Sequence, residues 1–163
     1  MAEAEQEEAE VISDEQKETV NTEKYLIFSI LGKQYSFPSK YIGEIALFDH
    51  VYPLPLVPSY VLGVVNRYSV PYALFDIGLL FNKTPCPQNK VLIFKDEIDR
   101  IAVLIDDVTG IADIHPEDIF AHERSIDQSE LTDAVAVSFS WNGNDVFVLD
   151  IHRILERVSR EMA

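Results

Sequence analysis

Histidines, which commonly bind metal ions, are few and scattered in this sequence. The four histidines, His50, His115, His122 and His152, fall in expected turns, loops and one helix, without the spacing of metal ligands. A closed zinc site needs four ligands held close together, so no metal site is expected. We expect His152 to lie on the solvent-exposed face of the last helix.

Cys86 is the one cysteine, and it stands between two prolines in the stretch Thr84 to Asn89, which is typical of a connector. A reactive thiol is usually activated by a basic neighbour that favours the thiolate, and the sequence places none beside it. We therefore interpret Cys86 as a loop residue without a catalytic role. A single cysteine also excludes an intramolecular disulfide, which fits a reduced compartment such as the cytoplasm.

The acidic pairs Asp106-Asp107 and Glu117-Asp118 raise two alternatives, general acid–base catalysis and calcium binding. Neither pair has the ligand spacing of an EF-hand loop. Successive side chains on a strand point to opposite faces, so Asp106 and Asp107 are not expected to share a site. We interpret both pairs as solvated turn residues.

Asp76 and Asp150 each follow an apolar strand, where a receiver fold would carry a phospho-acceptor. That fold needs strands alternating with long helices, which this pattern lacks, so we expect both aspartates to cap a following helix. Phosphate-binding loops, dinucleotide fingerprints and G-x-S-x-G motifs are also missing. The sequence predicts a non-enzymatic protein without a cofactor. A small-ligand or metal-dependent enzyme is the less favoured alternative.

The overall charge limits the class of partner. The 163 residues carry 13 basic and 28 acidic side chains, a net charge of −15, which disfavours nucleic acid and anionic membrane surfaces. Hydrophobic residues make up 47% of the chain, enough for a substantial core. No uncharged apolar run reaches the roughly 18 residues of a membrane span, and the acidic N-terminus does not resemble a secretory signal. Protein partners are therefore favoured.

Residues 1–22 are predicted to form a disordered acidic tail. They contain eight acidic residues and one basic residue, Lys17, and no aromatic residue precedes Tyr25. Such a composition does not bury enough apolar surface to order a chain. We favour a solubilising role for the tail, and partner binding is the alternative.

The remainder of the chain alternates between short apolar runs and turn residues. Turns at intervals of about 8–12 residues favour a barrel or a sandwich over a β-α-β fold. We expect strands at residues 24–30, 34–37, 61–65, 70–75, 90–94, 100–105, 108–114, 131–140 and 146–149.

Turns and short helices connect these strands. Hairpin turns are predicted at Gly32-Lys33, at Asn66 to Ser69 and around Asn142-Gly143, and Gly110 is a candidate bulge. A helical turn after Pro38 would carry Tyr41, Ile42 and Ile45 on one side. Residues 151–160 form the last helix, since their apolar side chains recur at helical spacing.

One internal echo indicates two similar units. The run Leu74-Phe75-Asp76-Ile77 resembles Val148-Leu149-Asp150-Ile151, and both follow a strand, a turn and a strand. Each run ends in an apolar segment that Asp76 or Asp150 is expected to cap. We infer two small β units in one chain.

From about Lys24 to Val158 the order of segments resembles the CheW family of chemotaxis coupling proteins. The most specific part runs from Val61 to Asn66 and ends, without a gap, at Phe75-Asp76-Ile77. The family has there a G-V-x-N strand, a short hairpin and a strand closing on Asp-Leu. The other matching segments are Tyr25-Leu26-Ile27-Phe28 with Gly32 and Tyr35, Ile42-Gly43-Glu44-Ile45, Ile105-Asp106-Asp107-Val108 and Leu149-Asp150-Ile151.

The resemblance implies a mostly-β fold, with two SH3-like five-stranded β-barrel halves around a shared hydrophobic core and short helices that include a C-terminal one. Within a CheW-like domain at 23–160, we expect the first half at about 24–84 and the second at about 90–150. The resemblance further implies a cytoplasmic adaptor, recruited to membrane receptor arrays, that links chemoreceptor tips to the regulatory domain of a CheA-type histidine kinase. The alternative is a divergent module that binds one of these partners or serves another signalling complex.

The resemblance also implies where partners bind. It places partner-binding surfaces at Ile42, Glu44, Ile45, Gly63, Asn66 and Tyr68, and Arg67 joins them as a neighbouring positive charge. Four of these residues have a simpler interpretation. Ile42 and Ile45 can be core residues, Gly63 can serve close strand packing and Glu44 can be an ordinary surface acid.

The chain departs from the family pattern at this hairpin. The usual Asn-Leu-Arg-Gly is replaced by Asn66-Arg67-Tyr68-Ser69, a usual proline falls on Ala73, and a usual glycine falls on Asp133. Tyrosine cannot make the forked bonds of arginine, but it offers a flat apolar ring. We predict that Tyr68 is exposed and packs on a partner. The alternative is that its ring folds back over its own barrel.

Overall fold

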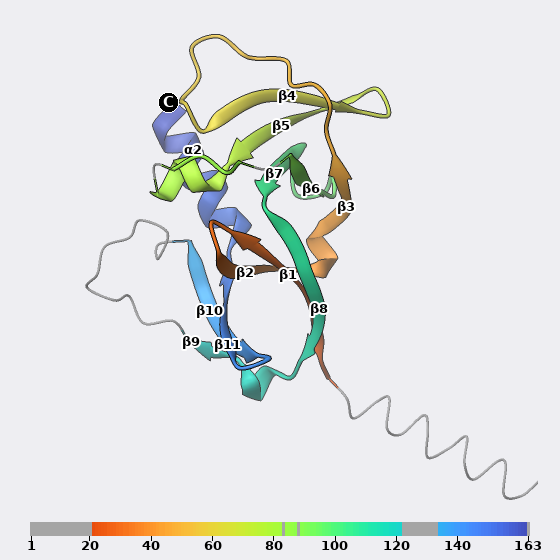
Figure 1. The fold of residues 1–163 in the computed structure, drawn as a ribbon, viewed down its shortest axis with the longest axis vertical. Coiled ribbons are helices and arrows are strands. Elements are labelled where there is room, and N and C mark those ends of the chain that lie inside the picture. Colours follow the sequence, from red (N-terminus) through yellow and green to blue (C-terminus); the bar gives the residue numbers. More distant parts are fainter. Residues whose placement is uncertain (1–20, 83, 88, 122–133, 163) are drawn as a thin grey trace, which may run out of the picture.

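The computed structural model describes residues 21–82, 84–87, 89–121 and 134–162, which form a mostly-β structure of two sheets and one α-helix (Figure 1). Residues 1–20 of the predicted tail (residues 1–22) and the position Asp133 lie outside the described residues. The strands are β1 (Glu23–Ile30), β2 (Lys33–Pro38), β3 (Ile42–Leu47), β4 (Val61–Arg67), β5 (Val70–Asp76), β6 (Lys90–Phe94), β7 (Ile101–Ile105), β8 (Asp107–Ile114), β9 (Phe120–Ala121), β10 (Val135–Trp141) and β11 (Asn144–Leu149). The helical elements are the 3-10 turns η1 (Ser39–Tyr41) and η3 (Pro116–Asp118), the π-helical turn η2 (Gly78–Asn82) and α2 (Ile151–Met162).

Each sheet takes strands from both parts of the chain. The first sheet has the order β8-β1-β2-β11-β10-β9, and the second has the order β3-β6-β7-β5-β4. Two parallel pairings join distant strands, β2 with β11 in the first sheet and β5 with β7 in the second. The expected boundary near residues 84–90 therefore does not separate the two sheets, and the first sheet has six strands rather than five. Long-range pairing of this kind is invisible in local sequence patterns.

The two sheets repeat one plan. Residues 24–28, Lys-Tyr-Leu-Ile-Phe, correspond to residues 90–94, Lys-Val-Leu-Ile-Phe, at a shift of 66 positions (90 − 24). The β4–β5 hairpin corresponds to β10–β11 at a shift of 74 (135 − 61), and both hairpins carry a register shift near their first residue. When each strand of the second sheet is replaced by its counterpart in the repeat, the order β3-β6-β7-β5-β4 becomes β8-β1-β2-β11-β10, which is the order of the first sheet without β9. The echo predicted from the sequence is thus part of a repeat. In this repeat the hairpin β1–β2 joins the sheet of β8, β10 and β11, and the hairpin β6–β7 joins the sheet of β3, β4 and β5.

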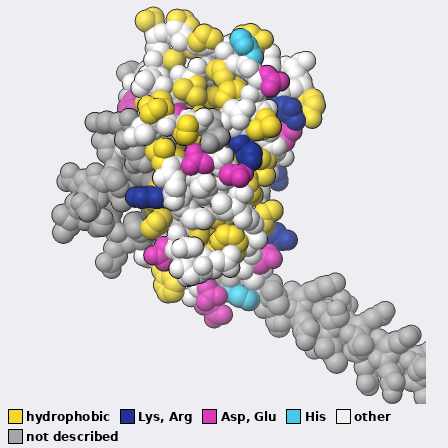
Figure 2. All heavy atoms as spheres, viewed as in Figure 1, with side chains coloured by type: hydrophobic (Ala, Val, Ile, Leu, Met, Phe, Trp, Pro, Cys, Tyr) yellow, Lys and Arg dark blue, Asp and Glu magenta, His cyan; other side chains and the backbone are white. Residues whose placement is uncertain are grey.

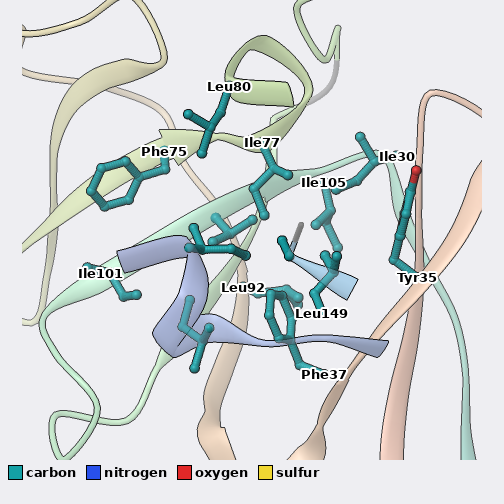
Figure 3. Packing of buried hydrophobic residues seen from close by; sticks show 14 of the residues in the cluster. Ile30, Tyr35, Phe37, Phe75, Ile77, Leu80, Leu92, Ile101, Ile105 and Leu149 are labelled. Atoms are coloured by element: carbon teal, nitrogen blue, oxygen red, sulfur yellow. The ribbon is translucent and has the colours of Figure 1, made fainter. Parts of the chain in front are cut away.

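A shared hydrophobic core lies between the sheets, and each sheet also encloses a smaller cluster. The shared core takes large side chains from both sheets and from α2, among them Phe37, Leu92, Ile105 and Leu149 (Figure 3). Val65, Val91 and Ile93 belong to the cluster inside the second sheet. Each fully buried Leu, Ile or Phe contributes about 1.5–3 kcal/mol, so this core dominates the favourable free energy of folding.

Two hairpin turns differ from the prediction, one in position and one in length. The first one consists of Leu31-Gly32 rather than Gly32-Lys33, and the second consists of Tyr68-Ser69 alone, with Asn66 and Arg67 in β4. All four of these turn residues have positive φ, as do Asn142 and Gly143. Two-residue turns of this handedness match the twist of the strands they join, which explains why non-glycine residues are held there.

The helical turn predicted through Ile42 and Ile45 is wrong. The helical geometry ends at Tyr41, and both isoleucines lie in β3, which pairs with β6. β-branched residues and Gly43 disfavour a helix, and pairing along β6 satisfies the backbone instead. The predicted bulge is present, because the pairing of β8 with β1 shifts between Gly110 and Val108.

The predicted caps are confirmed. The Oδ1 atom of Asp76 accepts a bond from the backbone N–H of Leu79 at 3.1 Å, and Oδ1 of Asp150 accepts one from His152 at 2.9 Å. Both carboxylates satisfy backbone donors at the start of a helical segment. His152 is exposed on α2, as predicted, while Ile151 is buried.

Candidate partner-binding surface

The structure places the predicted partner-binding residues on the two end strands of the second sheet. Ile42, Glu44 and Ile45 come from β3, Gly63, Asn66 and Arg67 come from β4, and Tyr68 begins the turn after β4. β3 and β4 are separated by three strands in the sheet order. They nevertheless approach each other, because the sheet is curved (Figure 1). A pair of side chains joins the two strands.

That pair is Glu44 and Arg67. The Nε atom of Arg67 lies 3.0 Å from both carboxylate oxygens of Glu44, and its Nη2 atom also contacts Oε1. The hydrogen bond from Arg67 lowers the pKa of the Glu44 carboxyl below its ordinary value. Forked bonds of this geometry are characteristic of arginine. Arg67 therefore supplies the positive charge that was expected beside Tyr68, and this charge meets Glu44. Arg67 stands one residue before Tyr68, the position at which the family usually has arginine.

Tyr68 is exposed, as predicted, with 81% of its surface accessible. Its ring does not fold over its own sheet. Instead, the guanidinium carbon of Arg67 lies 4.6 Å from the ring centroid, within cation–π range. Arg67 thus contacts Glu44 on one side and the aromatic ring on the other, and Tyr68 presents a flat surface supported by a cation.

Gly63 has a structural role in this arrangement. Its φ is +141°, and a Cβ atom built there would lie 2.2 Å from the carbonyl oxygen of Tyr52. The close approach lets Tyr52 and Val64 exchange two backbone hydrogen bonds of 2.8 Å. Close strand packing, one of the two interpretations of Gly63, is therefore confirmed, and a contact with a partner stays a prediction.

The two isoleucines of β3 differ. Ile42 is half-buried and packs against the shared core, whereas Ile45 is 43% exposed. Leu47, two residues further along the strand, is 63% exposed on the same side. Alternation along a strand produces this division. Ile42 is thus a core-packing residue, and Ile45 is available for contact.

A groove of about 250 Å³ opens between β3 and β4. Apolar side chains and polar rim residues share its lining, which consists of Ala46, Leu47, Phe48, Asp49, His50, Tyr52, Val65, Asn66, Arg67, Val91 and Ile93. Hydrophobic side chains are also prominent at the upper end of the molecule, where the second sheet lies (Figure 2). The groove was not predicted, because it depends on the curvature that brings β3 towards β4.

Sequence reasoning also missed three exposed residues in the segment between β3 and β4. Tyr52, Leu54 and Leu56 are large and exposed, and Leu56 has a φ of +57° and is fully accessible. The signal was present, since Pro53, Pro55 and Pro58 stiffen this segment and residues 51–60 contain no charge. Uncharged apolar residues on a rigid loop are typical of interaction surfaces.

The comparisons with known proteins agree with this geometry. The family model for the CheW-like domain matches residues 24–159. The chain belongs to the CheW-like domain family. A solved structure, the scaffolding protein TtCheW from Thermoanaerobacter tengcongensis, superposes on this CheW-like domain with a TM-score of 0.71. It is 14% identical over 80% of this chain and 85% of that chain, a likeness that concerns the fold. No curated protein matches the chain.

Family membership settles the class of function. CheW-like domains are chemotaxis scaffolding or adaptor domains, a non-enzymatic family, as expected for this chain. Within the part of the CheW-like domain that the structure describes, no group of three or more His, Cys, Asp or Glu side chains could hold a metal ion. His122 lies outside that part. Among the described helices, none is both long and apolar enough to cross a membrane.

The remaining chemical candidates of the CheW-like domain have structural partners. Cys86 lies in a loop, as predicted, and is buried there. Its Sγ lies 3.0 Å from Oδ1 of Asp106, and its backbone N–H donates to Asp76. Asp107 pairs with Lys90 instead. The prediction that Asp106 and Asp107 do not share a site is thus confirmed.

Proposed function

We propose that this CheW-like domain is a chemotaxis adaptor that links the cytoplasmic tips of chemoreceptors to the regulatory domain of a CheA-type histidine kinase. The observation that carries the proposal is the cluster formed by Glu44, Arg67 and Tyr68, with the exposed Ile45 at the next position of β3. The family resemblance assigns partner contacts to three of these positions, and the ion pair brings β3 and β4 to one surface.

The physical properties of this surface support a protein partner. An ordered ion pair carries an exposed aromatic ring, and the next residue of β3 exposes an aliphatic side chain. Aromatic side chains and arginine are enriched at the energetic centres of interfaces. Tyr68 supplies the ring, Ile45 supplies an aliphatic side chain, and the guanidinium group of Arg67 packs against the ring. Glu44 holds Arg67 in place, which reduces the conformational entropy that binding would otherwise cost.

The adaptor would act in the cytoplasm and join receptor arrays at the membrane through its partners rather than by inserting into the bilayer. The net charge of −15 disfavours direct contact with anionic lipid and with nucleic acid. Residues 1–22 would serve as an acidic, solubilising tail.

A second candidate function is favoured by one observation. Tyr68 stands where the family carries arginine, and the arginine of this chain is engaged by Glu44. A partner that needs a forked arginine contact at that position would lose it. The chain would then bind only one of the two partners, or a different signalling complex.

Binding measurements on purified proteins test both candidates. The full chain is titrated with the isolated kinase regulatory domain and, separately, with a receptor-tip fragment, both from the same organism as the chain. We expect Tyr68→Ala to weaken binding of at least one partner about 30-fold, or ~2 kcal/mol, without lowering stability. Saturable binding of only one partner would support the second candidate.

The repeat supplies a matched control for this experiment. Ile111 corresponds to Ile45 (45 + 66) and is 62% exposed on β8 of the first sheet. Ile45→Ser should weaken the same binding that Tyr68→Ala weakens, while Ile111→Ser should not. Equal effects of the two serine variants, or no binding of either partner by the wild-type chain, would contradict the proposed surface.

A further inference from the structure

The groove between β3 and β4 combines an apolar floor with free strand edges. Ala46, Val65, Val91 and Ile93 are apolar members of its lining, and all four belong to the interior cluster of the second sheet or pack against it. β3 and β4 are the terminal strands of that sheet, so one edge of each has no neighbouring strand among the described residues. Such edges present backbone N–H and C=O groups that can pair with another strand.

The backbone groups that face the groove follow from alternation along each strand. The N–H and C=O of Val64 point away from β5, because both bond to Tyr52. Asn66, two residues further, has the same orientation, and its partner on β5 is Pro71, which has no N–H to donate. Just after β3, the N–H of Phe48 donates to the carbonyl oxygen of Asn89, which precedes β6. The backbone groups of Leu47 therefore point away from β6. Asn66 and Leu47 therefore offer backbone groups on the two sides of the groove.

The chain itself shows that the β4 edge accepts an extended segment. Tyr52 pairs antiparallel with Val64 as an isolated bridge, and Gly63 provides the space for that approach. In an antiparallel register each step back on one strand is a step forward on the other, so continuation of this pairing by two residues would place His50 opposite Asn66. The pairing ends at one bridge, however, and the groove lies where the chain leaves the strand. One edge position of β4 beyond the bridge is thus left for another chain.

We propose that this groove binds a short extended peptide segment of a partner protein by strand addition to β4. The segment pairs its backbone with Asn66 and inserts one aliphatic or aromatic side chain onto Val65, Val91 and Ile93. Backbone bonds supply affinity in this mode, and the side-chain pocket supplies specificity. Asp49 on the rim and the net charge of −15 favour a segment flanked by basic residues.

A second copy of this chain fits the groove less well. The Leu54–Leu56 segment is apolar and exposed, but two chains of charge −15 repel each other. A partner segment with lysine on each side removes that repulsion. The proposal goes beyond the adaptor function, and its test needs neither the receptor nor the kinase, so the two can fail independently.

Four labelled nine-residue peptides, Lys-Thr-Val-Thr-X-Thr-Val-Thr-Lys with X as Val, Ile, Leu or Phe, serve as probes in fluorescence polarisation with the full chain. We expect saturable binding of at least one of them. Serine at X, or N-methylation of the amide of X, should weaken that binding at least tenfold. If none of the four binds, the proposal is overturned. The same holds if N-methylation has no effect, since the backbone would then play no part.

Two variants locate the binding on the chain. Asn66→Pro removes a backbone donor that β5 does not use, and proline is tolerated on an edge strand, so the fold should persist. The matched control is Ser140→Pro, at the equivalent position of β10 (66 + 74). We expect at least tenfold weaker peptide binding for Asn66→Pro and unchanged binding for Ser140→Pro. Equal behaviour of the two variants overturns the assignment.

A measurement on the wild-type chain avoids dependence on folding of the variants. Amide hydrogen exchange of Asn66, followed by NMR, should slow at least tenfold when peptide is bound, and that of Ser140 should not change. Unchanged exchange at Asn66 overturns the proposal. Sedimentation that shows self-association, abolished by Ala46→Phe, would assign the groove to a second copy and also overturn it.

Discussion

In each curved sheet a contact at equivalent positions joins two strands that are far apart in the sheet order, and the nature of this contact differs between the sheets. In the first sheet the ring of Trp141 lies against Gly110, where an added Cβ would be 2.6 Å from the ring. Glu44 and Arg67 occupy the equivalent positions of the second sheet (44 + 66 = 110 and 67 + 74 = 141) and form an ion pair. Aromatic packing closes one sheet, and a partly exposed ion pair closes the other.

The bridging segments repeat the same contrast. Phe120 pairs with Ser138 on β10 as part of β9, and Tyr52 pairs with Val64 at the equivalent position of β4 (64 + 74 = 138). The first sheet extends this pairing to a second pair, Ala121 with Val137, whereas the second sheet stops after one. The sheet that carries the proposed partner surface is therefore the less completely closed one. Unsatisfied edges and exposed charge are costly for stability and are typical of binding sites.

The largest expected effect concerns the bridge beside that groove. Gly63→Ala forces a side chain into a φ of +141° and places its Cβ 2.2 Å from a backbone oxygen, so we expect a loss of roughly 3 kcal/mol in the free energy of unfolding. Urea denaturation followed by circular dichroism measures it. Gly43→Ala is the matched control, because its nearest contact would be 3.4 Å. A loss below that of the control would show that the bridge is not rigid.

A smaller effect is expected where the first sheet closes. Trp141→Ala removes the ring that covers Gly110 and should lower the free energy of unfolding by about 2–3 kcal/mol, less than a fully buried tryptophan because Trp141 is half-buried. Partner binding by the second sheet should not change. Arg67→Ala should do the reverse, weakening binding with little change in the denaturation midpoint. If both variants lose stability equally, the contrast between the two closures is wrong.

Local sequence patterns predicted the elements of this fold better than the contacts between them. The alternation from residue 24 and the repeated Asp76 and Asp150 segments gave the strands and caps, because both depend on near neighbours. The hairpin exchange between the sheets was not predicted, since pairing such as that of Ala73 with Ile101 leaves no local trace. Local propensity also failed at Ile42 to Ile45, where pairing with β6 decided the structure.

The candidate surface shows the same limit. Resemblance supplied Glu44 and Tyr68, and the sequence placed Arg67 beside them, but only the curvature of the sheet shows that Arg67 reaches Glu44. The groove and the exposure of Leu56 depend on that curvature and on a strained turn. Such features arise from packing between strands distant in sequence, which a single sequence does not encode in any short window.

The smallest expected effect concerns the titration of Glu44. The hydrogen bond from Arg67 lowers the pKa of this carboxyl below its ordinary value of 4.5, so the folded state holds the charged form more strongly than the unfolded state. The stabilising contribution is therefore present above about pH 4.5 and is lost as the pH falls through the lowered pKa. NMR titration of the Glu44 carboxyl carbon should show its pKa rising towards 4.5 in Arg67→Gln, whereas Arg153→Gln on α2 should leave it unchanged. Because both partners are partly exposed, salt at about 0.5 M should reduce the difference between wild type and Arg67→Gln. A Glu44 pKa that is the same with and without Arg67 would mean that the ion pair does not join β3 and β4 in solution. The proposed contrast with the aromatic contact of Trp141 in the first sheet would then be wrong.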